Sequence, residues 1–439
     1  MLQTILSALR SPELRKKLLF TAAILAIYRF GSFVPVPGID LETLQAAIDE
    51  RGSRLLDFLN LFAGGALTRF AVFALGIMPY ITASIIMQVL GVVIPKLEEW
   101  QQQGAIGQRK ITQWTRYVTM GIAVLQSTAM AFLFHNGGGG LLGGGGNPTD
   151  INVLDPFTPP RVLLVVLVLT SGTALLMWMG ELITQRGIGN GMSLLIFSSI
   201  VSAIPGQFGQ IYVERGWGVL LPLILLFIGV LVAIVFVENG QRRIPVQFAK
   251  RVVGRRMYGG QSTYIPLKVN QSGVIPIIFA SSILLLPAIL VSFLGGAGSG
   301  WRYEIQRAVD NYILNSQNIV YVSLFALLII AFAYFYNSIA FDPVRQADQI
   351  RRQGGFIPGV RPGPQTEAYL AKAVNRITLP GAVFIALIAI LPYLILWAAD
   401  VSTFAFAGTS ILISVGVALE LMRQIDAQLM LRNYEGFLK

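Results

Sequence analysis

Long apolar segments separated by short polar stretches run through most of this chain. Crossing the roughly 30 Å hydrocarbon core of a bilayer takes about 20 helical residues. Ten segments of this kind lie near residues 18–34, 71–94, 115–135, 161–180, 191–208, 217–237, 273–294, 318–340, 377–397 and 402–422. The pattern predicts an all-α polytopic membrane protein with ten transmembrane helices.

The run that contains the second span is nearly twice as long as a span requires. Residues 58–95 contain one charge, Arg69, and are interrupted by Gly64, Gly65 and Pro79. Glycine costs about 1 kcal/mol relative to alanine in a helix, so the part before Arg69 is too Gly-rich to span. Non-spanning backbone at membrane depth must lie within protein or beside a watery cavity. We therefore expect a cavity on the outer side, followed by a true span in GIMPYITASIIMQVL.

Composition supports a membrane protein, and the placement of charge predicts its orientation. Hydrophobic residues make up 54% of the chain and charged residues only 13%, against about 25% in soluble domains. With the N-terminal side called inside, the inside segments carry 25 of the 33 Lys and Arg residues and the outside segments 7. This bias predicts that both termini are cytoplasmic.

Two inside loops are unusually long and basic. Residues 238–270 carry seven Lys or Arg and residues 341–376 carry six. The first loop has strand-like runs, IPVQFAKRVV and STYIPLKV, around a Gly-Gly turn. These charges either serve topology alone or form an ordered surface for an anionic partner, such as lipid headgroups, nucleic acid or an acidic protein.

Ten spans divide naturally into two halves of five. An odd number of spans reverses orientation, so a repeat of this kind must be inverted, with its working site between the halves near mid-membrane. We predict halves at 1–208 and 209–439.

The ionisable residues that mark proton relays and ion coupling are scarce within the spans. Arg29 and Arg69 lie deepest, both toward the outer face. The chain has no cysteine and no HExxH, GxSxG or Walker A motif. We therefore expect no catalysis, no cofactor and no metal. A passive protein-conducting channel and a secondary transporter of small solutes both fit, and a lipid-handling membrane enzyme fits less well.

Apolar residues recur at helical spacing inside the spans. Ile77 and Ile81 lie four apart, as do Met192 and Ile196, while Ile278 and Ile413 lie mid-span in the second half. Such residues are ordinary core or lipid-facing positions, although an apolar constriction can also gate a pore by dewetting. Pattern alone does not choose between these roles.

A few polar residues also lie within the spans. Thr82 and Gln88 lie in the second span, and Ser281 and Ser282 in the seventh. They either bond within their own helix or form a weak polar seam that can part.

Seven stretches, in order from the first span to the last, resemble bacterial SecY, the central subunit of the protein-translocation channel. They are GSFVPVPGID (31–40), FALGIMPYITASII (73–86), MWMGELITQRGIGNGMS (177–193), VFVENGQRRIPVQFAKR (235–251), QSTYIPLKVNQSGVIPIIFASSI (261–283), PGVRPGPQTEAYL (358–370) and FAGTSILI (406–413). The Gly-rich loop 136–148 departs from the family pattern.

The resemblance implies a channel in the bacterial cytoplasmic membrane, with halves formed by spans 1–5 and 6–10. Such a channel secretes unfolded polypeptides and releases apolar helices sideways into lipid. The implied partners are the small membrane subunits SecE and SecG, the SecA motor, the ribosome, signal sequences, nascent chains and membrane lipids.

The resemblance also assigns roles to residues. A mid-membrane pore ring maps onto Ile77, Ile81, Met192, Ile196, Ile278 and Ile413, with Met192 where the family often has a branched aliphatic residue. A plug maps onto about 56–69, including Leu61, Phe62, Gly64, Gly65, Leu67 and Arg69. A lateral gate between spans two/three and seven/eight includes Thr82, Gln88, Ser281 and Ser282. A docking platform for the ribosome or SecA maps onto Arg242, Arg243, Lys250, Arg251, Arg255, Arg256 and Arg361.

Overall fold

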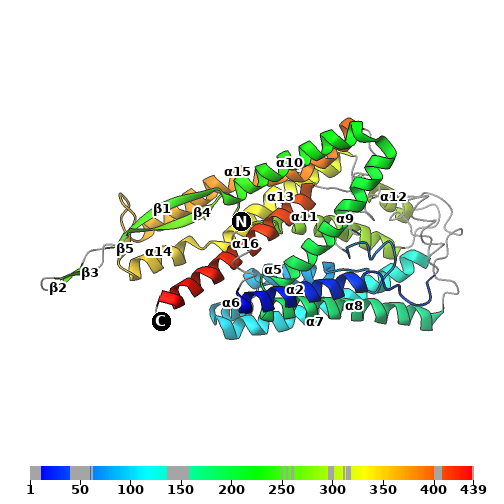
Figure 1. The fold of residues 1–439 in the computed structure, drawn as a ribbon, viewed down its shortest axis with the longest axis horizontal. Helices are drawn as coiled ribbons and strands as arrows, with labels where there is room; N and C mark the ends of the chain where they lie inside the picture. The colour runs from blue at the N-terminus through cyan, green and yellow to red at the C-terminus, as the bar shows by residue number, and fades with distance from the viewer. Residues whose placement is uncertain are drawn as a thin grey trace.

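The computed structural model is mostly helical and elongated, with a small sheet at one end (Figure 1). The structure describes residues 11–39, 60, 63–135, 158–248, 251–253, 256–258, 262–294, 301–309, 312, 318–399 and 408–437. The Gly-rich loop 136–148 lies outside these residues.

Each predicted span overlaps one long helix of the structure. These helices are α2 (Pro12–Gly31), α5 (Met78–Val93), α7 (Ala105–His135), α8 (Pro159–Arg186), α9 (Gly191–Arg215), α10 (Trp217–Asn239), α11 (Ile275–Leu294), α13 (Ile319–Ala340), α15 (Pro364–Ala399) and α16 (Gly408–Phe437). Three short helices, α6 (Pro95–Gln102), α12 (Trp301–Ala308) and α14 (Pro343–Arg352), lie between them.

Fewer than ten of these helices meet criteria of length and apolar composition for crossing a membrane. In the described part of the chain, five helical stretches are long and apolar enough, and α5 with α6, bent by 100°, makes a sixth. The five contain α8, α9, α10, α13 and α15. The all-α polytopic membrane architecture predicted from the sequence is confirmed.

Proline and capping residues explain where several helices begin. Pro12 opens α2 with Ser11 at the N-cap, because proline lacks the N–H that the first turn leaves unpaired. The Asn190 side chain accepts a hydrogen bond from the Met192 N–H at the start of α9, and Asn318 does the same for Val320 in α13. These caps satisfy backbone donors that have no partner within the helix.

The second span is shorter at its start than the predicted range 71–94. Residues 71–77 form turns, and α5 begins only at Met78. Phe70 and Gly76 have positive φ angles of 42° and 55°, which turn the chain and stop a helix from forming earlier. The range 71–94 was therefore wrong at its N-terminal end, whereas most of the stretch GIMPYITASIIMQVL is helical.

The long helices pack in two connected groups. In one group α7 lies between α5 and α8, and α2 packs on α8 and α9. In the other, α13 contacts α11 and α15, and α16 contacts α10 and α15. Helix α9 joins the groups through α10 and α16, and α11 joins them through α5 and α7 (Figure 1).

The basic loops fold into a small sheet at one end of the molecule. Strand β1 (Gln241–Phe248) pairs antiparallel with β4 (Ser262–Lys268), and β5 (Gly355–Phe356) pairs on the other side of β1. Strands β2 (Arg251–Val253) and β3 (Arg256–Tyr258) form a hairpin that projects beyond this sheet (Figure 1). The predicted strands are confirmed, but the run IPVQFAKRVV divides into β1 and β2, and the Gly-Gly turn lies outside the described residues.

Candidate functional site

Buried aliphatic side chains from four helices meet in one group, which we call the central apolar cluster. Its members from the predicted ring are Ile77, Met192, Ile196, Ile278 and Ile413, and Ile81 packs against it half-buried. Ile77 is 2% exposed and Ile413 1%. The structure therefore brings all six predicted ring residues together, although they are up to 336 positions apart in the chain.

The ring residues lie near the N-terminal ends of their helices. Ile77 is the N-cap of α5, and the N–H of Ile81 donates a hydrogen bond to the Ile77 carbonyl at 3.1 Å. The two side chains therefore lie one turn apart on one face of the helix. Met192 and Ile196 are spaced in the same way in the first turns of α9. The first turns of these helices therefore position the ring residues.

The segment before α5 also contributes to the cluster. Ala63, Ala66 and Leu67 are buried members of it. Gly64 and Gly65 both have positive φ angles, 64° and 83°, a conformation that costs other residues energy. Of the predicted plug residues, Leu61 and Phe62 lie outside the described residues, and Arg69 is exposed.

Side chains of α2 and α9 hold this segment in place. The Arg29 guanidinium donates to the Gly64 carbonyl, and the Tyr28 hydroxyl shares a hydrogen bond with the Ser199 hydroxyl beneath it. A methyl group on Gly64 would lie 3.0 Å from the Tyr28 oxygen. The sequence indicated only that Arg29 lies within a span. It did not predict the roles of Tyr28 and Ser199.

Two arginines also contact one aromatic ring beside this segment. The Arg29 guanidinium lies 4.8 Å and the Arg69 guanidinium 4.2 Å from the centre of the Phe33 ring. Cation–π contacts of this kind contribute about 0.5–1 kcal/mol each where exposed. The Arg69 contact connects the segment to the end of α2.

The predicted gate residues bond mostly within their own helices. Thr82 donates to the Met78 carbonyl at 3.0 Å, and Ser281 donates to the Ile278 carbonyl at 3.0 Å. The Ser282 hydroxyl is buried and has no partner among the described residues. Gln88 is half-buried. Helix α11 does contact α5 and α7, so the two sides of the predicted gate are adjacent without a polar seam from Thr82 or Ser281.

Several predicted docking residues are exposed at or near the sheet. Arg242 and Arg243 of β1 are exposed, and the Arg243 guanidinium lies 4.8 Å from the centre of the Tyr264 ring. Arg361 is exposed just before α15. Only the backbones of Arg251 and Arg256 are described, in β2 and β3, and Lys250 and Arg255 lie outside the described residues.

The buried side of the same sheet covers a second hydrophobic group, which we call the platform core. It combines residues of both basic loops with the start of α15, namely Ile244, Val246, Leu267, Ala347, Ile350, Ile357, Leu370, Ala373 and Val374. The alternation of buried and exposed positions along β1 places Ile244 and Val246 inward and Arg243 outward. The sequence predicted the strands but not this shared core.

The central apolar cluster is made of closely packed hydrophobic side chains. Its members are aliphatic, aromatic or methionine side chains, which exclude water and ions when they pack together. Among the described residues, no group of three or more His, Cys, Asp or Glu side chains could hold a metal ion.

Comparison with known proteins gives a consistent result over nearly the whole chain. The sequence profile of the family described as SecY matches residues 71–422. The protein translocase subunits SecY of Mycobacterium bovis and of Streptomyces scabiei are each 47% identical to it, over 100% of both chains.

Solved structures share the fold at much lower identity. One, described as the structure of a protein conducting channel, matches with a TM-score of 0.61 at 18% identity, over 93% of this chain and 91% of that chain. Sec61 in a canine ribosome-channel complex matches with a TM-score of 0.58 at 16% identity, over 93% and 91% of the two chains.

Proposed function

Because this chain belongs to the SecY family and is a subunit of a protein-conducting channel, we propose that the central apolar cluster is where that channel closes. The observation that carries the proposal is the convergence of five buried ring residues, from α5, α9, α11 and α16, into one cluster, with half-buried Ile81 packed against it. An apolar constriction excludes water and ions by dewetting and offers no strong bonds to a passing polypeptide. The same six residues can therefore seal the resting channel and close around a chain in transit.

The segment at about 56–69 acts as a plug on the outer side of this seal. Its described part packs Ala66 and Leu67 into the cluster and is held by the Arg29 hydrogen bond to the Gly64 carbonyl. One hydrogen bond to a charged group contributes about 1.5–3 kcal/mol, a strength that a passing chain can overcome. The plug can thus leave its place without disturbing α2 or α9.

The lateral gate lies between α5 and α7 on one side and α11 and α13 on the other. Residues 1–208 and 209–439 form the two halves that part there, related as an inverted repeat. Thr82 and Ser281 satisfy their hydroxyls within their own helices, so parting the gate breaks no hydrogen bond of theirs. Helices in lipid lack the hydrophobic force that holds helices together in water. Both features favour lateral release of an apolar helix into the membrane.

The sheet end of the molecule is the cytoplasmic docking platform, in the cytoplasmic membrane of a bacterium. Helix α2 begins and α16 ends toward this end of the molecule (Figure 1), which agrees with the inside charge bias. Exposed Arg242, Arg243 and Arg361 offer positive charge to ribosomal RNA or to acidic patches of the SecA motor. SecE and SecG are the small subunits that complete the channel, which takes signal sequences and nascent chains as substrates and contacts membrane lipids.

Ion leak through reconstituted channels tests the seal. Replacing Ile77, Ile81 and Ile278 together with Ser should raise the resting conductance by about tenfold or more, since about 1.4 kcal/mol in the gating equilibrium is a factor of ten. A matched control replaces three lipid-exposed residues of α10, Leu221, Leu225 and Val232, with Ala. Resting conductance that stays at the parental level in the Ser variant would overturn the assignment of the seal.

A further inference from the structure

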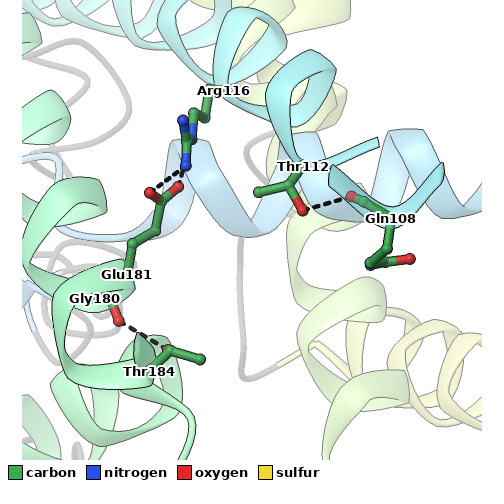
Figure 2. A network of polar contacts seen from close by, with 6 residues as sticks. All are labelled: Gln108, Thr112, Arg116, Gly180, Glu181 and Thr184. Carbon is green, nitrogen blue, oxygen red and sulfur yellow. Dashed lines mark hydrogen bonds and ion pairs between the residues drawn. The ribbon is translucent and has the colours of Figure 1, made fainter. Parts of the chain in front are cut away.

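One turn of α8, from Gly180 to Thr184, contacts two neighbouring helices on two sides. With 3.6 residues per turn, Gly180 and Thr184 share one side of α8, and Glu181 points about 100° away from Gly180. Figure 2 shows Glu181 directed at Arg116 of α7, with Gly180 and Thr184 on the adjoining turn. A single rigid turn thus connects the surroundings of α7 with those of α9.

The contact with α7 is a bidentate ion pair. Arg116 Nε lies 2.6 Å from Glu181 Oε1, and Arg116 Nη2 lies 2.5 Å from Oε2. The side chain of Glu181 is only 17% exposed and that of Arg116 43%. Two parallel charge-assisted bonds fix orientation as well as distance. This pair therefore holds α7 in a defined position against α8.

The contact with α9 is close backbone packing. The Thr184 hydroxyl accepts from the Gly191 N–H at 2.9 Å and donates to the Gly180 carbonyl at 2.9 Å. A methyl group on Gly191 would lie 1.9 Å from the Gly180 oxygen, and one on Gly180 would lie 2.5 Å from the Met192 sulfur. The Met192 side chain thus occupies the space that the missing Gly180 side chain leaves.

We propose that this turn couples α7 to Met192, so that a displacement of α7, transmitted to α8 through the Arg116–Glu181 pair, moves Met192 within the ring. Helix α7 also contacts α11 across the proposed gate, so the same turn links the gate to the seal. Arg116, Glu181 and Gly180 are positioning residues in this arrangement, because they act through Met192. The inference rests on the ring and gate proposed above.

A double-mutant cycle on ion leak tests the coupling in the assembled, reconstituted channel. Arg116→Gln should raise the resting conductance several-fold when Met192 is present and change it little in a Met192→Ala background. The exchanged pair, Arg116→Glu with Glu181→Arg, should restore the parental conductance. Arg345→Gln is the control, because it breaks the exposed 3.0 Å pair with Asp342 on α14 with the same change of charge and should leave the leak unchanged.

A second cycle approaches Met192 from its other contact. Gly180→Ala should raise the leak by crowding the Met192 sulfur, and Met192→Ala should suppress that increase. Should Arg116→Gln lower the yield of folded protein, Arg116→Lys replaces it, since it keeps the charge but loses the bidentate geometry. Both cycles compare fold-changes in resting conductance. If the two substitutions act independently, the fold-change of the double variant equals the product of the two single fold-changes.

The outcomes separate this coupling from the seal itself. If the fold-changes of Arg116→Gln and Met192→Ala multiply, or the charge exchange fails to restore the leak, the coupling is overturned while the seal stands. If Ile278→Ser also leaves the leak unchanged, the ring assignment fails and this inference fails with it.

Discussion

The central apolar cluster and the platform core are made of similar residues but differ in what holds them together. Ile77 in the first and Ile244 in the second are both almost fully buried. The platform core lies under strands and a helix whose outer faces are charged, so separating it would expose apolar area to water at about 25 cal/mol per Å². The central cluster lies among membrane helices, where lipid is as apolar as the side chains. Under the proposed function the central cluster parts around a passing chain, whereas the platform core stays packed.

The hydrogen bonds of the platform and of the membrane helices differ in the same way. In the platform, β1 and β4 are paired at seven successive positions from Gln241 to Gln247, and β5 extends the ladder. Between α5 and α11, the Thr82 and Ser281 hydroxyls stay within their own helices. The strand ladder thus fixes the shape of the platform, whereas the Thr82 and Ser281 hydroxyls add no tie between α5 and α11.

The largest expected effect comes from joining the two sides of the gate covalently. The chain has no native cysteine, so Thr82→Cys with Ser281→Cys places the only thiols, one on α5 and one on α11. A short bis-maleimide that links them should abolish translocation of a secretory protein into vesicles. Each single-cysteine variant, treated alike, is the control. Undiminished transport at high crosslinking yield would contradict lateral parting at this place.

Weakening the platform core should have a large effect of another kind. Ile244→Ala removes a buried side chain and should cost about 2–5 kcal/mol of stability in that region. We expect a lower thermal unfolding midpoint and weaker ribosome or SecA binding, with the resting ion leak unchanged. The surface variant Arg242→Glu should weaken binding in a salt-dependent way without lowering the midpoint. A rise in leak for Ile244→Ala would show that the two regions are not independent.

The smallest expected effect concerns a single hydroxyl beside the gate. The Ser282 hydroxyl is buried without a partner in the described structure, and such a group costs about 1–3 kcal/mol. Ser282→Ala should therefore stabilise the closed state by about 1 kcal/mol, seen as a higher unfolding midpoint in detergent and fewer spontaneous openings. Ser281→Ala removes a bond that is made and serves as the control. An equal or lower midpoint for Ser282→Ala than for Ser281→Ala would disprove this account.

Local pattern in the sequence predicted most of the membrane architecture. The hydropathy pattern predicted ten segments, each of which overlaps a long helix in the described chain, because a spanning helix needs an apolar run in the chain itself. The alternating runs in residues 238–270 predicted β1 and β4 for a similar reason. Gly64, Gly65 and Pro79 located the break before α5, although the run did not show that α5 begins only at Met78.

Contacts between distant residues were decided only by the tertiary structure. The sequence indicated Arg29 as a charge within a span, but not that Arg29 holds the Gly64 carbonyl. Nor did it indicate that Glu181 pairs with Arg116, 65 positions away. Likewise, nothing local showed that α14 and Ile357, which follows β5, complete the platform core. Hydropathy and turn residues act over a few neighbouring positions, whereas these partners meet only when whole helices and loops have packed. The ring depended on both, because its residues were named from a family resemblance in the sequence and are brought together only by the fold.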